Sequence, residues 1–237
     1  MSRLFVASAS IAALACHTAS AALTTPYLEN FSDATVTVEA NATTTLTYKD
    51  ITYSVDGNGK MGVFDLPSFL GTSYSSISGL GILGDFVWTG ATTNNVHDFT
   101  MSADGGVKFR LASLDAVTGN SGPPTIFTIT AYSGATQTAQ ITGLDLATLT
   151  STTYGALTSN SVDAVNIGPG DDSGYGQSLL FTGSGWQSVD RIVFTTTGND
   201  LLLGLDNIQF ANPIPEPSAL VISMLGLIGT LAIRRRR

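Results

Sequence analysis

The sequence is poor in the residues on which many functions depend. Its 237 residues include one Cys, two His and two Trp, and only 12% are charged, about half the usual share for a soluble domain. One Cys excludes a disulfide framework, and so few Cys and His exclude zinc-finger and iron–sulfur sites. Lys and Arg number 10 against 18 Asp and Glu, a net charge of −8. This balance argues against binding to nucleic acid, which needs a basic face.

Hydroxyl side chains take the place of the missing charges. The chain has 24 Ser and 32 Thr, twice the 28 charged residues. Uncharged hydroxyl groups are therefore expected to keep much of the surface hydrated. The length suffices for one ordinary domain with a real core, together with accessory segments.

The N-terminus has the pattern of a secretory signal peptide. Arg3 precedes the apolar residues 4–15, and Ala19-Ser20-Ala21 place small residues at the −3 and −1 positions of a cleavage site. We expect residues 1–21 to be removed on export, and a buried N-terminal helix is the alternative. Because Cys16 falls inside this segment, the mature protein is expected to contain no cysteine.

The C-terminus combines a short apolar run with a cluster of arginines. Residues 219–233 carry no charge and are followed by Arg234, Arg235, Arg236 and Arg237. As a helix this run spans roughly 22 Å, short of a ~30 Å hydrocarbon core, but snorkelling side chains and thinner bilayers reduce the difference. We expect one transmembrane helix with its arginines in the cytoplasm and residues 22–212 outside. A buried C-terminal helix is the alternative.

A proline-rich linker, residues 213–218, precedes this apolar run. Proline disfavours both helix and strand here, so the linker is expected to be stiff and extended. The ordered combination of Pro215-Glu216-Pro217, a short apolar helix and a terminal Arg cluster resembles the PEP-CTERM sorting signal over residues 213–237. The resemblance implies recognition by an exosortase, a transpeptidase-like integral membrane enzyme of Gram-negative bacteria, in a setting of exopolysaccharide and biofilm. By this likeness the residues that the enzyme recognises are Pro215, Glu216, Pro217 and Arg234 to Arg237.

Residues 22–212 have the pattern of one all-β domain. Short alternating segments rich in Thr, Val and Ile are separated by Gly, Asn, Asp and Pro, which is typical of a two-sheet sandwich. Strands are expected at 35–39, 45–48, 51–55, 107–111, 126–132, 137–142, 178–182, 188–195 and 201–210. Residues 144–160 fit either a loop or a short helix. We expect a jelly-roll-like sandwich with a core that includes Phe109, Leu111, Phe127, Ile129, Phe181, Val193, Ile208 and Phe210.

The same region contains candidates for sugar binding. In order, the segments 107–115, 127–134, 186–194 and 205–210 resemble the jelly-roll ectodomains of PEP-CTERM proteins, akin to galactose-binding-like and carbohydrate-binding modules. Sugar binding does not follow from such a fold alone. Three aromatic side chains are candidates for stacking on the apolar face of a sugar ring, with packing in or beside the core as the alternative: Trp88, Tyr175 and Trp186.

The acidic balance of the domain suggests a cation. Residues 22–212 hold 17 acidic and 5 basic residues, a net of −12, and acidic extracytoplasmic domains often bind Ca²⁺ through several oxygen ligands. Asp171 and Asp172 lie in a Gly-rich segment, for which a solvated loop is the alternative. Asp206 is expected to share its face with Ile208 and Phe210, and a buried carboxylate there needs a cation, Arg191 or backbone N–H groups as its partner.

A second acidic turn, Asp56-Gly57-Asn58-Gly59, begins like a calcium-binding EF-hand loop. Lys60 and Met61 stand where that loop requires a ligand and a glycine. A hairpin turn is therefore the expectation for this segment.

Patterns of catalytic residues are weak. Without residues 1–21 the only His is His97, and no Ser lies in a G-x-S-x-G elbow. Glu29 and Glu39 are the only Glu residues of the domain and lie near its start, so nothing marks the facing carboxylates of a glycosidase. We expect an exported, non-enzymatic surface or matrix protein, briefly anchored in the inner membrane, with an exosortase-like enzyme and extracellular polysaccharide as partners. A Ca²⁺-dependent carbohydrate-binding module and a polysaccharide hydrolase are the alternatives.

Overall fold

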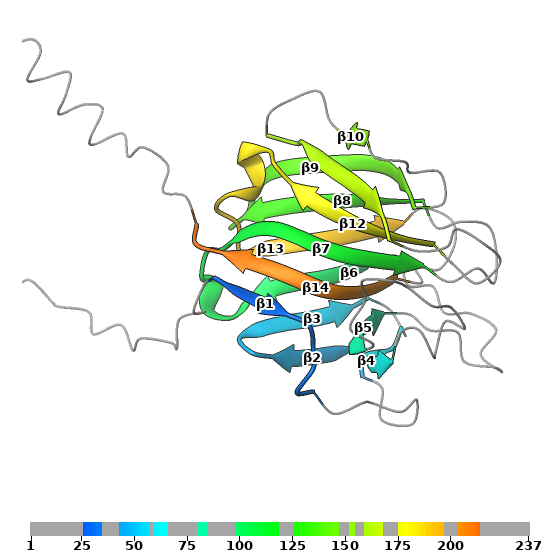
Figure 1. The fold of residues 1–237 in the computed structure, drawn as a ribbon. Helices are drawn as coiled ribbons and strands as arrows, with labels where there is room; N and C mark the ends of the chain where they lie inside the picture. Colours follow the sequence, from blue (N-terminus) through cyan, green and yellow to red (C-terminus); the bar gives the residue numbers. More distant parts are fainter. Residues whose placement is uncertain are drawn as a thin grey trace, which may run out of the picture.

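The computed structural model describes residues 26–34, 43–56, 59–65, 80–84, 98–118, 126–146, 152–154, 159–167, 175–196 and 203–213. Within these ranges the chain forms two antiparallel β-sheets and two short 3₁₀ turns, with no α-helix (Figure 1). The expected all-β two-sheet sandwich is thereby confirmed. In the same ranges, no helix has the length and hydropathy that a membrane crossing requires. The expected signal peptide, the strand at 35–39 and the apolar run at 219–233 lie outside these ranges.

The larger sheet has eight strands, in the order β10-β11-β12-β7-β14-β5-β4, with β1 also paired to β14. One half of β14 pairs with β5 and the other half pairs with β1, while β7 lies along its opposite side. The strands are β1 (Tyr27–Glu29), β4 (Met61–Asp65), β5 (Leu80–Gly84), β7 (Arg110–Thr118), β10 (Thr152–Tyr154), β11 (Val162–Asn166), β12 (Tyr175–Phe181) and β14 (Leu203–Ala211).

The smaller sheet has six strands, in the order β2-β3-β6-β13-β8-β9. Its two hairpins, β2–β3 and β8–β9, each turn through two residues: Lys49-Asp50 and Gly134-Ala135. Both Lys49 and Asp50 have positive φ, 47° and 65°, which a type I′ hairpin turn requires at its two central residues. The strands are β2 (Thr45–Tyr48), β3 (Ile51–Val55), β6 (Asp98–Ala103), β8 (Ile126–Ser133), β9 (Thr136–Asp145) and β13 (Arg191–Thr196).

Two backbone bridges join the sheets. Thr43 and Met61 exchange hydrogen bonds of 3.0 and 2.8 Å at one edge. Phe109 and Val189 exchange bonds of 2.7 and 2.8 Å where β7 and β13 begin. These bridges tie the layers together without a disulfide.

The core lies between the two sheets and contains most of the side chains expected there. The alternation of each strand directs every second side chain inward. Phe109, Leu111, Phe127, Ile129, Phe181, Ile208 and Phe210 are at most 2% exposed, as predicted. Val193 was assigned to the wrong face of its strand. Ile192 and Phe194 are fully buried in β13, and Val193 between them is only half-buried.

Several expectations about local structure need correction. The sequence patterns missed β1, β4, β5, β6, β10 and β11. Between residues 144 and 160, the described part contains the end of β9 and the short strand β10, and no helix. The segment after Asp56 does not close a hairpin, because β3 belongs to the smaller sheet and β4 to the larger one.

One end of the sandwich is where the last strand finishes, and we call it the exit end. Ala211, the last residue of β14, lies opposite Arg110, and Phe210 lies opposite Tyr27 at the start of β1. The Phe109–Val189 bridge places the start of β13 at the same end. In Figure 1 this end lies on the left, where β1 begins and β14 ends.

Candidate functional site

The calcium candidate Asp206 is fully buried in β14 and lies directly opposite Asp115 of β7. The expectation that Asp206 shares its face with Ile208 and Phe210 is wrong. A β-bulge follows Asp206, and Asn207 has a φ of 47°. Leu205 and Ile208 both belong to the core as a result, so Asp206 lies on the other side of the sheet.

Asp115 is the residue at this site that the sequence analysis missed. Its side chain is 6% exposed, and its Oδ2 accepts a hydrogen bond of 2.8 Å from Nδ2 of Asn207. Burial raises the pKa of Asp115 above its ordinary value, and hydrogen bonds from Asn207 and Ser178 oppose that rise. The Ser178 position lies opposite Asp115 on β12, so three adjacent strands build the site.

Two buried carboxylates that face each other repel when both are ionised. A proton on one of them or a bound cation relieves that repulsion. In the described part of the chain, no group of three or more His, Cys, Asp and Glu side chains is arranged to hold a metal ion. Asp171 and Asp172, the other candidate calcium ligands, lie outside the described residues.

The aromatic candidates for sugar stacking have different environments. Trp186 is fully buried and packs against Phe181, with ring centroids 4.7 Å apart, so it cannot stack on a sugar and the alternative of packing in the core holds. Tyr175 is half-buried and packs against the core. Trp88 lies outside the described residues.

Trp186 is held inside by a tight 3₁₀ turn, Ser184–Trp186. A Cβ on Gly185 would lie 2.3 Å from the carbonyl oxygen of Thr138 and 2.4 Å from that of Ser159. Only glycine allows this approach of three backbone segments. The turn therefore fixes the indole ring in the core rather than at the surface.

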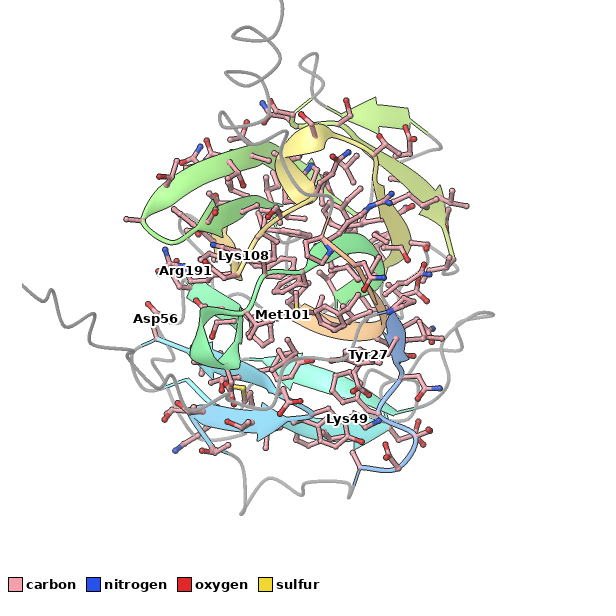
Figure 2. All side chains as sticks on the ribbon, turned by 90° about the vertical axis from the view of Figure 1, so that its left-hand side faces the viewer. Tyr27, Lys49, Asp56, Met101, Lys108 and Arg191 are labelled. Atoms are coloured by element: carbon pink, nitrogen blue, oxygen red, sulfur yellow. The ribbon has the colours of Figure 1, made fainter. Side chains whose placement is uncertain are left out.

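One side of the exit end is formed by a cluster around Lys49 (Figure 2). Its Nζ lies 2.9 Å from Oδ1 of Asp33 and 3.7 Å from Oε2 of the fully buried Glu29. The Glu29 carboxylate also accepts a 2.8 Å hydrogen bond from the backbone N–H of Phe31. Burial raises the pKa of Glu29, against the effect of that hydrogen bond and of Lys49.

Tyr48 completes this cluster. Its hydroxyl donates a hydrogen bond to Asp33, and its ring lies 5.0 Å from Nζ of Lys49 and 5.5 Å from the ring of Phe31. Burial and the Asp33 carboxylate raise the pKa of the Tyr48 hydroxyl to about 12. Lys49 and Phe31 both contact this ring. We therefore interpret the cluster as part of the packing at this end of the sandwich.

The other side of the exit end carries Lys108 and Arg191, which lie close together in Figure 2. Lys108 forms an ion pair with Asp190, and the same carboxylate accepts a 2.7 Å hydrogen bond from the N–H of Gly134. The guanidinium of Arg191 lies over the ring of Tyr132 at 4.3 Å from its centroid, a cation–π contact. This arrangement holds the arginine in place at the end of the sandwich.

Lys49, Lys108, Arg110 and Arg191 account for four of the five basic residues between 22 and 212. All four lie at the exit end by strand register, because β2, β8 and β6 finish there and β7 and β13 start there. The fifth, Lys60, precedes β4 at the opposite end, where Met61, Gly84 and Leu203 lie in register. The sequence contains these basic residues but gives no sign that four of them lie at one end of the sandwich.

The described β-sandwich ends at Ala211, just before a distinct C-terminal segment. Residues 213–237 match the family of the PEP-CTERM protein-sorting motif, as expected from Pro215-Glu216-Pro217 and the terminal arginines. The motif indicates an exosortase-sorted extracellular protein and implies processing by exosortase, a membrane enzyme. No curated protein and no solved structure matches the chain significantly. Of the matched segment, only Pro213 lies within the described residues.

Proposed function

We propose that the β-sandwich is a non-enzymatic surface or matrix protein that exosortase-dependent sorting delivers, and that it associates with extracellular polysaccharide. The observation that carries this proposal is the position of the motif. The last strand ends at Ala211, two residues before the matched segment begins at Pro213. Every strand that the structure describes therefore precedes the sorting signal, so the sandwich can be released or transferred intact.

The apolar run 219–233 serves, in this proposal, as a transient inner-membrane anchor. The four arginines that follow it stay in the cytoplasm by the positive-inside rule. The Ser- and Thr-rich sequence suits an extracellular matrix, because hydroxyl groups bond to sugars and water without the salt dependence of charges.

The proposal is tested by changing the two parts of the signal separately. Full-length protein is expressed with Pro215, Glu216 and Pro217 changed to Ala, and separately with Arg234 to Arg237 changed to Ala. Cell fractionation should show both variants retained at the inner membrane and unprocessed, while the wild-type chain reaches the surface or the medium. Wild-type processing and location in both variants would remove the proposal. Lys60→Ala, far from the signal, is the matched control.

A Ca²⁺-dependent glycan-binding module is the second candidate, and the facing pair Asp115 and Asp206 favours it. A cation between them would relieve their repulsion and tie β7 to β14. At a Ca²⁺ concentration of 100 times Kd, binding adds about 2.7 kcal/mol of stability. Thermal melts with Ca²⁺ and with a chelator measure this directly. Asp115→Asn should abolish the shift, and equal melts of the wild-type protein in both conditions would exclude this site. A glycan array run in the same two conditions then tests sugar binding.

A further inference from the structure

The outer face of the smaller sheet presents its side chains in regular rows. The inward positions of this sheet are apolar, and Tyr53, Phe99 and Ile192 are among its fully buried residues. Successive side chains of a strand point to opposite faces, so the residues between these positions point outward. The register of the six strands then aligns the outward residues across the sheet.

Two rows of outward residues cross all six strands. The row nearer the exit end consists, from β2 to β9, of Thr47, Thr52, Ser102, Arg191, Tyr132 and Gln137. The next row consists of Thr45, Ser54, Thr100, Val193, Thr130 and Gln140. A third, shorter row crosses β6, β13 and β8 with Asp98, Thr195 and Thr128. Nine of these 15 residues are Ser or Thr, and two are charged.

A row across the larger sheet has a different character. From β11 to β1 it consists of Asp163, Leu180, Ser113, Gln209 and Leu28. This row contains one hydroxyl group, and its two leucines are 40% and 54% exposed. The abundance of Ser and Thr in the whole chain therefore does not explain why hydroxyl groups fill the rows of the smaller sheet.

Hydrogen bonds within the face fix some of these side chains. The hydroxyl oxygens of Thr47 and Thr52 lie 2.9 Å apart, and Nε2 of Gln140 donates a 3.2 Å hydrogen bond to the hydroxyl of Thr130. Other Ser and Thr side chains of the rows are exposed or half-buried, and a ligand could reach them from solvent: Thr45, Ser54, Thr100, Thr128 and Thr195.

We propose that the outer face of the smaller sheet binds a single extended chain of a neutral polysaccharide. The proposal rests on the polysaccharide association in the proposed function and assigns it a surface. Hydroxyl and amide side chains donate and accept hydrogen bonds, as the hydroxyl groups of sugars do. Neighbouring strands place the groups of a row about 4.8 Å apart, a spacing comparable with the length of one sugar unit in an extended chain.

The charge of the face favours a neutral polymer over an acidic one. The two charged residues of the rows, Arg191 and Asp98, have opposite signs. Residues 22–212 together carry a net charge of −12, which repels a polyanion. Neutral chains avoid this repulsion and still find hydrogen-bonding partners along the rows.

The twist of the sheet favours a flexible chain over a planar surface. Adjacent strands of a sheet are rotated by about 20–25°, so a row that crosses six strands winds as it runs. A single polysaccharide chain can follow such a path. A flat partner, such as an ice crystal or crystalline polysaccharide, would contact only part of it.

Native electrophoresis of the detergent-solubilised full-length chain, through gels that contain a soluble polysaccharide, tests the proposal. The probes are three neutral polymers, hydroxyethyl cellulose, galactomannan and arabinoxylan, and the acidic polymer alginate. At least one neutral polymer should retard the wild-type chain, with the same dissociation constant at low and high salt. Combined Thr100→Val, Thr128→Val and Thr195→Val substitutions should raise that constant about tenfold or more, because three hydroxyl groups are lost while the β-branched shape is kept.

The matched control changes hydroxyl groups beside the larger sheet. Ser113→Ala combined with Thr182→Val should leave the dissociation constant unchanged, and melting curves show whether each variant keeps its fold. A folded triple Val variant that binds like the wild-type chain would overturn the proposal. Retardation by alginate alone would also overturn it, as would self-association or shaping of ice crystals that the triple Val variant loses without any polysaccharide binding.

Failure of the proposed function gives a different result from failure of this assignment. A wild-type chain that binds none of the four polymers, and none of the exopolysaccharide from the matrix of the cells that export it, would remove polysaccharide association and this proposal together. Binding that the triple Val variant keeps would remove only the assignment to this face. C-terminal processing should be the same in the wild-type and triple Val chains, because the sorting motif is unchanged.

Discussion

The ring of Tyr27 stacks on the ring of Phe210, with centroids 4.9 Å apart and an angle of 26° between the planes. The contact joins the first described strand to the last one, in register. It links the region just after the expected signal peptide to the residues just before the sorting motif. The first and the last described strands are thus joined to each other at the exit end.

We predict a measurable coupling between these two rings. Phe210→Ala should lower the free energy of unfolding by about 3–5 kcal/mol, because Phe210 is a fully buried anchor. Tyr27→Ala should cost less, since Tyr27 is half-buried. In a double-mutant cycle followed by chemical denaturation, the coupling energy should be about 1 kcal/mol. Strict additivity of the two changes would contradict the stacking.

Gly185→Ala should be strongly destabilising for steric reasons. The added Cβ would meet two backbone carbonyl oxygens at 2.3 and 2.4 Å, and backbone cannot move aside as a flexible side chain can. We expect a loss of about 1–3 kcal/mol or more, measured as a lower Tm. Gly134→Ala is the matched comparison, because nothing lies within 4 Å of its Cβ position and only its φ of 62° opposes the change. A milder effect at Gly185 than at Gly134 would show that the packing is looser.

The raised pKa of Asp115 should make the stability of the protein depend on pH. Burial raises its pKa above the ordinary value of 3.8, so between these two values the folded state binds more protons than the unfolded state. The stability from this group is full below the unfolded pKa and is lost as pH rises through the folded pKa. Asp115→Asn should therefore reduce the drop in Tm between about pH 4 and about pH 7.

Glu29 should change the pH dependence of stability in the same direction as Asp115, because its pKa is also raised. A Glu29→Gln variant serves as the comparison and should remove a separate part of the dependence. An Asp115→Asn protein with the wild-type pH profile would show that Asp115 is not protonated more readily in the folded state.

Asn207 adopts a positive φ in the bulge and also donates a hydrogen bond to Asp115. Substitutions can separate these two roles. Asn207→Gly keeps the φ of 47° without strain but removes the amide that donates to Asp115, and the loss should be about 1–3 kcal/mol. Asn207→Ala removes the same hydrogen bond and adds roughly 1–2 kcal/mol of backbone strain. Denaturant titration should therefore rank the Ala variant below the Gly variant. The reverse order would mean that the bulge relaxes when the amide is lost.

Period-two alternation carried most of the fold information in the sequence. It located β2, β3 and β8 closely, because each presents one largely apolar and one largely polar face. It failed for β4, where Met61 to Phe64 are all buried, and for three-residue strands such as β1, which are too short to show a period. Val193 was misplaced because β13 has apolar residues on both faces.

The candidate sites were harder to predict because they depend on register between distant strands. Asp206 was recognised, but its partner Asp115 lies 91 positions earlier in the chain, and the bulge at Asn207 reverses the face that alternation assigns. The position of Lys108, Arg110 and Arg191 at one end of the sandwich likewise follows from pairing between distant strands. The sorting motif, in contrast, could be predicted from the sequence. Its parts follow one another along the chain, so it is recognised without knowledge of the fold.

The most direct test of the account is the intact mass of the protein recovered from the cell surface or the medium. We predict a chain that begins after the signal peptide and lacks the segment from the sorting motif to Arg237. The variant with Pro215, Glu216 and Pro217 changed to Ala should keep Arg237 and remain with the inner membrane. Surface-exposed wild-type protein that still carries Arg234 to Arg237 would contradict sorting by an exosortase.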